Sequence, residues 1–382
     1  MKYIKVFLVF FICIIFFFIV PIFYVTSAHN AYILKRQVKY IQTLTTIRCN
    51  ENAPFFLKKI LAKSIYMDSL TNQIAYTHNN KTYLCTSGWS NAENTRKTTN
   101  DTLFKYASLT KLLTADLILN LVNKGQLDLN DPITKFIDLN LPLNDLQIKK
   151  ITIRDLLQHS AGFNRHSSID YIFNSKPWCT EHLANQLSQI KLQFNVGEKN
   201  IYSNEGYCIL GKILEHEYQK SYQSILMQEY ESLKFFTVLK QYKNETYYND
   251  ELSDYKVGYL NTLYLANLTA SADVVGTSQD LNLALNIMIK RKPYNVTSLD
   301  GMLNCDITSY KSCYGLAMSP IRYENGLLFN RDGVMPGLTT YSFVTEKKNT
   351  FVLLTNSMPF NAQKNTIAFK NFIANKLLEY EK

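Results

Sequence analysis

The chain has 382 residues, of which 46 % are hydrophobic, with 26 tyrosines and 22 phenylalanines. This composition excludes an intrinsically disordered chain and predicts a packed globular protein. The formal net charge of +10 at pH 7 is spread along the sequence without a basic block, so we expect no nucleic-acid partner, and attraction to an anionic envelope surface is the simpler reading.

The N-terminal segment predicts a membrane anchor. Residues 6–25 are apolar and uncharged, and Lys2 and Lys5 precede them. Twenty apolar residues span a hydrocarbon core of about 30 Å, whereas a signal peptide usually has an apolar region of about 7–15 residues. We therefore expect residues 1–28 to be a single-pass transmembrane anchor or an uncleaved signal. Cleavage at the small residues 26–28 is the alternative.

The cysteines permit disulfide bonds in an oxidising compartment. Cys13 lies in the apolar segment, and six cysteines remain outside it: Cys49, Cys85, Cys179, Cys208, Cys305 and Cys313. Cys305 and Cys313 are spaced to close a small loop, and buried free thiols are the alternative. The sequence has no Cys-x-x-Cys, and its six histidines lack metal-ligand spacing. We therefore expect no metal site and no cofactor.

The first predicted elements come after a mixed segment. Residues 29–64 are expected to form a juxtamembrane arm, partly helical. Residues 74–89 predict two strands around an Asn-Asn turn. Residues 108–124 predict a helix whose apolar side chains cover much of its circumference, which indicates a buried helix. The following segments, up to about residue 320, predict mostly helices and loops.

The C-terminal part changes character and predicts strands again. Three strands and a final helix are expected at 327–331, 339–346, 349–356 and 361–380. Strands near both ends with helices between them predict an α/β (α+β) fold. Its antiparallel sheet is built from both chain ends, is flanked by helices and carries an inserted, mostly helical lobe. We expect residues 65–382 to form this one catalytic domain.

Ser108 and Lys111 stand three residues apart at the start of the predicted buried helix, which places them on one helix face. The first turn of a helix offers unpaired N–H groups, which suit negative charge on an attacked carbonyl. Burial also favours an uncharged lysine, which can accept the serine proton. The spacing alone is weak support, because Ser188–Lys191 and Ser253–Lys256 have the same form without opening a buried helix.

Seven sequence blocks give this pair a context. They are DTLFKYASLTK (101–111), LDLNDPI (127–133), ITIRDLLQHSAGF (151–163), IYSNEGYCILGKILE (201–215), SADVVGTSQDL (271–281), YGLAM (314–318) and RDGVMPGLTTY (331–341). Together and in this order they resemble the serine β-lactamase-related family, which includes class C β-lactamases, D-stereospecific peptidases and esterases. The resemblance covers roughly residues 65–380 and implies a β-lactamase/transpeptidase-like fold.

The resemblance also implies roles for individual residues. Ser108 would be the nucleophile and Lys111 its partner. Tyr202, in the family's Tyr-x-Asn motif, would shuttle protons, and Asn204 would contact the substrate and Lys111. Tyrosine and lysine are poor bases alone, but a neighbouring pair titrates as a unit. The resulting ester on Ser108 would then be released by water.

The third family motif is where the sequence departs from the pattern. Lys-Thr-Gly, His-Thr-Gly or His-Gly-Gly is usual, but Arg331, Asp332 and Gly333 stand here. Arg331 keeps a positive charge, which would favour an ionised Tyr202 or bind an acidic group. Asp332 either points into the site and repels a β-lactam carboxylate, pairs with Arg331, or faces solvent at a strand end. The N–H groups of Val334 and Ser108 would form the oxyanion hole.

His159, followed by Ser160, does not make a catalytic triad. We interpret residues 159–162 as a loop that closes a helix, with Gly162 supplying the turn.

These observations predict a membrane-tethered serine hydrolase that acts on an ester or amide through a Ser108 acyl-enzyme. Asp332 suggests weak activity on β-lactams. One alternative is a catalytically degraded scaffold or sensor on the same fold, and another is a cell-wall D-amino-acid carboxypeptidase. We expect a small-molecule or peptide substrate, and a catalytic domain on the periplasmic or extracellular side of the cell membrane.

Overall fold

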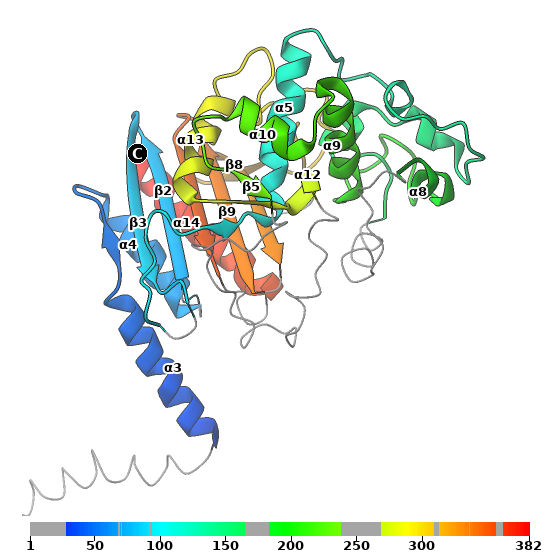
Figure 1. The fold of residues 1–382 in the computed structure, drawn as a ribbon. Helices are drawn as coiled ribbons and strands as arrows, with labels where there is room; N and C mark the ends of the chain where they lie inside the picture. The colour runs from blue at the N-terminus through cyan, green and yellow to red at the C-terminus, as the bar shows by residue number, and fades with distance from the viewer. Residues whose placement is uncertain are drawn as a thin grey trace, which may run out of the picture. The chain divides into compact units, whose positions relative to one another are not determined.

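The computed structural model describes residues 28–67, 69, 71–91, 94–164, 183–237, 269–308, 313–335, 337–356 and 362–382 (Figure 1). The chain divides into two compact units, Met1–Thr46 and Ile47–Lys382. The described part of the first unit contains helix α3 (Ala28–Leu44). The predicted anchor at residues 6–25 lies outside the described residues. Within the described ranges, no helix combines the length and apolar character needed to cross a membrane.

The larger unit is built on a seven-stranded antiparallel sheet in the order β1-β3-β2-β10-β9-β8-β7 (Figure 1). The strands are β1 (Arg48–Cys49), β2 (Thr71–His78), β3 (Lys81–Gly88), β7 (Ser319–Tyr323), β8 (Gly326–Met335), β9 (Leu338–Thr345) and β10 (Thr350–Thr355). Strand β2 pairs with β10, so that Ile74 lies opposite Leu353. Segments from the two ends of the chain therefore meet inside the sheet, which confirms the predicted fold.

Local sequence explains the hairpin between β2 and β3. Asn79 and Asn80 both adopt positive φ angles, 49° and 62°. Asparagine tolerates this left-handed conformation, and two such residues form the tight turn that matches the twist of paired strands. The predicted Asn-Asn turn is confirmed. A second, three-stranded sheet was not predicted; it contains β4 (Phe104–Lys105), β6 (Val274–Gly276) and β5 (Phe236–Thr237).

Helices cover both faces of the large sheet. On one face, α4 (Phe55–Tyr66) and α14 (Ala362–Glu381) share an apolar cluster with Phe343 and Leu353. On the other face, α13 (Ser278–Met288) packs against β2 and β10, and Val344 and Val352 join the core of the helical lobe. Side chains alternate along a strand, so neighbouring residues in β9 and β10 pack into two separate apolar cores on opposite faces of the sheet.

The helical lobe lies between β3 and β7 in the chain. It contains α5 (Thr110–Asn123), α6 (Ile153–Leu157), α8 (Leu183–Gln189), α9 (Glu205–Tyr218), α10 (Tyr222–Glu229) and α12 (Thr269–Ala272). Helix α5 is buried on nearly all sides, as predicted. Its buried Asp116 accepts hydrogen bonds from Arg291 Nε at 2.7 Å and from the Tyr230 hydroxyl at 2.6 Å, which compensates that carboxylate in the interior.

The larger unit also includes residues 47–64, which the sequence analysis placed in the arm. Strand β1 pairs with β3, and the Cys49–Cys85 disulfide links the two strands. Helix α4 buries one face against the sheet. Cys305 and Cys313 are also bonded, so the predicted small loop is closed. Cys208 is disulfide-bonded as well, whereas Cys179 lies outside the described residues.

Candidate active site

Ser108 lies on a sharp turn between β4 and α5. It is the middle residue of the 3-10 helix η2 (Ala107–Leu109), and Ala107 has a φ angle of 48°, which is uncommon for a residue with a side chain. The preceding Tyr106 fixes this turn. Its N–H donates to the Val274 carbonyl at 2.8 Å, and its carbonyl accepts from the Thr340 hydroxyl at 3.0 Å. The strained turn presents the Ser108 side chain on a partly exposed surface.

Lys111 follows in the first turn of α5 and is fully buried. Its Nζ atom donates hydrogen bonds to Asn204 Oδ1 at 2.7 Å and to the Ser271 carbonyl at 2.8 Å. Burial lowers the pKa of Lys111 well below its usual range, and the positive charge of Arg331 lowers it further. The Lys111 amine is therefore electrostatically biased toward its neutral form.

Tyr202 bridges the lysine and the serine. Its hydroxyl lies 2.5 Å from Ser108 Oγ and donates at 3.4 Å to Asn204 Oδ1. Lys111 Nζ lies 4.9 Å from the centroid of the Tyr202 ring. Asn204 is the N-cap residue of α9, so the start of that helix brings the Tyr-x-Asn motif to the start of α5. The structure thus places the four residues together as the sequence predicted.

Arg331 lies behind Tyr202 on β8 and is 4 % exposed. Its Nη1 donates to the Ala317 carbonyl at 3.0 Å, and its Nη2 lies 3.2 Å from His159 Nε2. Three ring centroids lie 5.4–5.9 Å from its guanidinium carbon, those of Tyr202, Tyr207 and Tyr314. A cation enclosed in this way is poorly placed to bind a substrate carboxylate. Of the two expectations, the geometry favours stabilisation of charge on Tyr202.

Asp332 lies on the opposite face of β8, because successive side chains of a strand alternate. It stands opposite Tyr341 of β9 and accepts a hydrogen bond from Lys370 of α14 at 2.9 Å. The expectations that Asp332 points into the site or pairs with Arg331 are therefore wrong. The carboxylate lies outside the site, partly exposed, with its own cation. The reason for expecting weak activity on β-lactams is thereby removed.

Gly333 lets β8 pass close to the Ser108 turn. A Cβ atom there would lie 2.5 Å from Thr340 Oγ1 and 2.8 Å from both Ser108 N and Tyr106 O. No larger residue fits this approach without displacing the strand or the turn. Val334, the next residue, is 43 % exposed. The pairing of its N–H with that of Ser108 in an oxyanion hole stays a prediction.

Sequence reasoning missed His159 as part of the site. The loop interpretation holds, because α6 ends at Leu157 and Gly162 has a φ angle of 84°. However, the His159 ring packs in the site, with centroid distances of 4.7 Å to Tyr202, 5.2 Å to Tyr207 and 4.7 Å to Tyr314. Both His159 and Tyr314 belong to blocks that carry the family resemblance, and this was the available signal.

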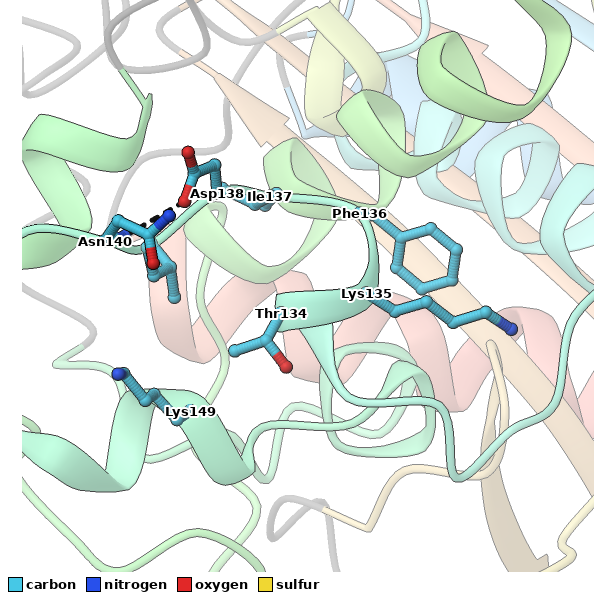
Figure 2. Close-up of a pocket in the computed structure, with 8 residues that line it drawn as sticks. Thr134, Lys135, Phe136, Ile137, Asp138, Asn140 and Lys149 are labelled. Atoms are coloured by element: carbon cyan, nitrogen blue, oxygen red, sulfur yellow. Dashed lines mark hydrogen bonds between the residues drawn. The ribbon is translucent and has the colours of Figure 1, made fainter.

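A separate surface hollow of about 550 Å³ lies in the loops after α5. Figure 2 shows its lining residues, among them Lys135, Phe136 and Lys149, with Asn140 N–H donating to Asp138. None of the predicted site residues lines it. Among the residues that the structure describes, no group of His, Cys, Asp or Glu could hold a metal ion.

The sheet, the serine at the start of a buried helix and the lysine, tyrosine and asparagine around it define a protein of the β-lactamase and penicillin-binding type. The Beta-lactamase family model matches residues 66–232. A "Putative fimbrial assembly protein FimD, serogroup D" of Dichelobacter nodosus is 33 % identical over 326 residues, 82 % of this chain and 81 % of the relative. The chain belongs to the serine β-lactamase-related family.

Two further comparisons agree with this assignment. A "Putative D-alanyl-D-alanine carboxypeptidase" of Salmonella paratyphi B is 34 % identical over 131 residues, 31 % of this chain and 29 % of the relative. The solved structure of D-amino acid amidase from Ochrobactrum anthropi superposes with a TM-score of 0.70 at 21 % identity, covering 85 % of this chain and 98 % of the amidase. At that identity the amidase supports the fold alone.

Proposed function

We propose that the chain hydrolyses an ester or amide through an acyl-enzyme on Ser108. The observation that carries the proposal is the 2.5 Å contact between Ser108 Oγ and the Tyr202 hydroxyl, beside a buried Lys111. A serine becomes a nucleophile when an adjacent group accepts its proton. The Tyr202 hydroxyl lies within hydrogen-bond distance of Ser108 Oγ, and Lys111 is the neighbouring amine biased toward its neutral form.

In the proposed reaction, Tyr202 gives its own proton to the neutral Lys111 amine and takes the Ser108 proton, while Oγ bonds to the substrate carbonyl carbon. Arg331, with its guanidinium carbon 5.5 Å from the Tyr202 ring centroid, stabilises the negative charge on the tyrosine during this exchange. The carbonyl oxygen gains negative charge between the N–H groups of Ser108 and Val334. The leaving alcohol or amine departs with a proton returned through Tyr202. Water then attacks the Ser108 ester and releases the acid.

The substrate class is drawn from the relatives. The name of the partial relative, a putative D-alanyl-D-alanine carboxypeptidase, refers to a peptide of D-amino acids. An amide or ester of a D-amino acid, of the kind found in cell-wall peptides, is therefore the substrate that we propose. Arg331 is buried and poorly placed to bind a substrate carboxylate, which supports a substrate whose binding does not depend on a carboxylate contact with Arg331.

A second candidate function is a scaffold in surface-filament assembly. It is favoured by the name of the relative that covers most of the chain, a putative fimbrial assembly protein. The argument from Arg331 and Asp332 no longer supports a degraded site, because Arg331 lies against Tyr202 and Asp332 faces away. The two candidates differ in whether Ser108 reacts.

A fluorophosphonate probe tests the proposal directly. We expect the full chain in mild detergent to gain the mass of one adduct, and peptide mapping to place it on the segment that carries Ser108. The matched control is Ser188→Ala, which removes the serine of the other described Ser-x-x-Lys pair and should leave labelling intact. A folded wild-type chain that gains no adduct, or gains it at another residue, would favour the scaffold.

We also propose that residues 6–25 anchor the chain, with the catalytic domain on the periplasmic or extracellular side. The uncharged apolar run supports an anchor, and the disulfides Cys49–Cys85 and Cys305–Cys313 support an oxidising compartment. The full chain should stay in the membrane pellet after a carbonate wash, and protease added outside the cytoplasmic membrane should digest it. A chain in the soluble fraction, or one protected from that protease, contradicts the proposal.

A further inference from the structure

A buried histidine lies directly behind the proposed reacting groups. The His159 residue is 2 % exposed, its Nδ1 faces the Ser203 N–H at 3.3 Å, and its Nε2 faces Arg331 Nη2 at 3.2 Å. Both ring nitrogens therefore face N–H donors, and a second ring proton would oppose donor to donor at both contacts. This geometry requires a neutral imidazole. Because the guanidinium can only donate, Nε2 accepts its charge-assisted bond and the ring proton lies on Nδ1, where the 3.3 Å approach of the Ser203 nitrogen is a contact and not a hydrogen bond.

The charges around His159 act in the same direction. The titratable groups that face it are the Arg331 guanidinium on β8 and the Lys111 amine on α5, together with three tyrosines, Tyr202, Tyr207 and Tyr314. Burial lowers the pKa of His159 well below its usual range, and the positive charge of Arg331 lowers it further, as a protonated Lys111 would. The imidazole therefore accepts a hydrogen bond without adding a positive charge beside Arg331.

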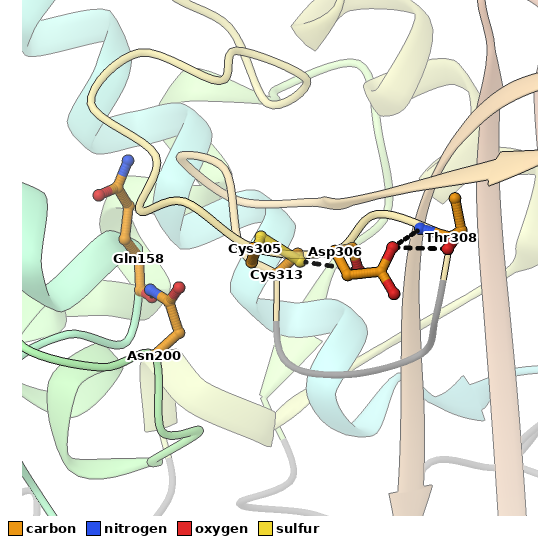
Figure 3. Close-up of a disulfide and its surroundings, with 6 residues drawn as sticks. All are labelled: Gln158, Asn200, Cys305, Asp306, Thr308 and Cys313. Carbon is orange, nitrogen blue, oxygen red and sulfur yellow. Dashed lines mark hydrogen bonds between the residues drawn. A yellow bond between two sulfur atoms is a disulfide. The ribbon is translucent and has the colours of Figure 1, made fainter.

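The backbone around His159 is held in an uncommon conformation. Its φ angle is 57°, and its carbonyl accepts from the Ile201 N–H at 2.7 Å. The preceding residue, Gln158, is held as well. Its carbonyl accepts from Asn200 Nδ2 at 2.7 Å, and Figure 3 shows these two residues. The Gln158 side-chain amide donates to the Asp300 carbonyl at 2.7 Å. A strained residue fixed from several sides is a common feature of functional sites.

Tyr314 also packs against the imidazole, and its ring meets it edge-on with the centroids 4.7 Å apart. Tyr314 directly follows Cys313, which is bonded to Cys305 (Figure 3). The disulfide thus restrains the segment that carries Tyr314, and the loop after α6 carries His159. The His159 ring has little room to leave Arg331.

We propose that His159 is a positioning residue, which holds the Arg331 guanidinium against Tyr202 by accepting its hydrogen bond at Nε2. The inference deepens the proposed function and rests on it. In the described part of the chain, Arg331 forms no ion pair with a carboxylate, whereas Arg154, Arg291 and Arg322 each do so. The Ala317 carbonyl and His159 are the polar contacts that orient its side chain.

Two substitutions separate positioning from packing. His159→Phe keeps an aromatic ring but removes the acceptor, whereas His159→Gln offers a side-chain oxygen in its place. For a neutral ester we expect His159→Phe to lower kcat about 10–100-fold with KM nearly unchanged. The acid limb of its pH profile should move to higher pH, because a displaced cation stabilises charge on Tyr202 less well. His159→Gln should recover most of the rate and move the limb back.

A second measurement does not depend on hydrolysis. The ultraviolet absorbance of tyrosinate is titrated in wild type and in each His159 variant. The curve of the same chain carrying Tyr202→Phe is subtracted from each, so that the difference follows Tyr202 alone. We expect its midpoint to rise in His159→Phe and to return toward wild type in His159→Gln. An unchanged midpoint in a folded His159→Phe chain overturns the inference, as does an equal loss of rate in both variants without a shifted acid limb. Failure of wild type to react with the fluorophosphonate overturns only the proposed hydrolysis.

Discussion

The Ser108→Ala variant is expected to lose hydrolysis of its substrate by a factor on the order of 10⁴ or more, and to lose fluorophosphonate labelling completely. Without Oγ no acyl-enzyme forms. Tyr202 and Lys111 then have no serine proton to accept, so their correct position cannot restore the rate. Groups that act as a unit fail together when one is removed, so the loss should approach that of the whole site. Steady-state kcat/KM and intact mass measure the two effects.

The variant should remain folded, which separates lost chemistry from lost structure. Ser108 is partly exposed, and its side chain makes one hydrogen bond, to Tyr202. Removing such a bond changes the free energy of unfolding by about 0.5–1.5 kcal/mol. Thermal unfolding should therefore shift little. Residual labelling of a folded Ser108→Ala chain would show that another nucleophile reacts.

Ser188→Ala is the informative control because the two serines share a spacing but differ in surroundings. Ser188 lies in α8, and its hydroxyl donates to the Asn185 carbonyl at 2.7 Å. Lys191, three residues further on, is exposed. The Ser-x-x-Lys spacing thus occurs without a buried amine or a tyrosine hydroxyl at the serine. If Ser108→Ala and Ser188→Ala changed labelling and hydrolysis equally, the surroundings of Ser108 could not explain its reactivity.

The large sheet could be predicted because its longer strands carry clear signals. Strands β9 and β10 are buried on both faces and read as apolar or β-branched runs, and the Asn79-Asn80 turn marks a hairpin. Strands β1, β4 and β5 have two residues each, which is too short for any periodic signal. Their pairing depends on partners distant in the chain. For example, β4 pairs with β6, about 170 residues later.

The site was predicted in part for a similar reason. Ser108 and Lys111 are neighbours in sequence, and Tyr202 differs from the other Tyr-x-Asn matches because a helix begins directly after it. The contact between His159 and Arg331 joins residues 172 positions apart, and no local pattern predicts it. Asp332 shows a different limit. Strand alternation predicts that it faces away once Arg331 points inward, but the sequence did not establish which of the two does so.

Replacing Lys111 with methionine is expected to lower the rate of acylation about 10²–10⁴-fold, the usual contribution of a positioned acid or base. Methionine has a similar length and fits a buried position, but its side chain has no titratable group and no charge. Its thioether cannot donate to Asn204 Oδ1 or to the Ser271 carbonyl. The matched control is Lys191→Met, which removes the exposed lysine of the other described pair and should leave the rate unchanged.

The same variant tests whether Lys111 is neutral in the folded protein. Its pKa is lowered by folding, so between the folded and unfolded values the unfolded chain binds more protons, and stability falls as the pH decreases. The contribution of Lys111 should therefore raise the stability of wild type as the pH rises from about 7.5 to about 9, above the range where histidine titrates and below the ordinary values of about 10 for tyrosine and 10.4 for lysine. Nearer pH 10 the buried tyrosines, whose pKa is raised by folding, act in the opposite direction. Lys111→Met should flatten that slope, whereas Lys191→Met should preserve it.

The slope is the decisive quantity, because the absolute stability of Lys111→Met combines opposing effects. The variant removes the cost of keeping an amine from its proton, but it also removes the hydrogen bonds that Lys111 Nζ donates to the Asn204 Oδ1 and Ser271 carbonyl oxygens, at about 0.5–1.5 kcal/mol for each bond. These oxygens do not titrate, so they cancel from the pH dependence measured by urea unfolding. An identical slope in wild type and Lys111→Met would mean that the buried amine stays protonated, and Tyr202 would then have to accept the Ser108 proton without a neutral lysine beside it.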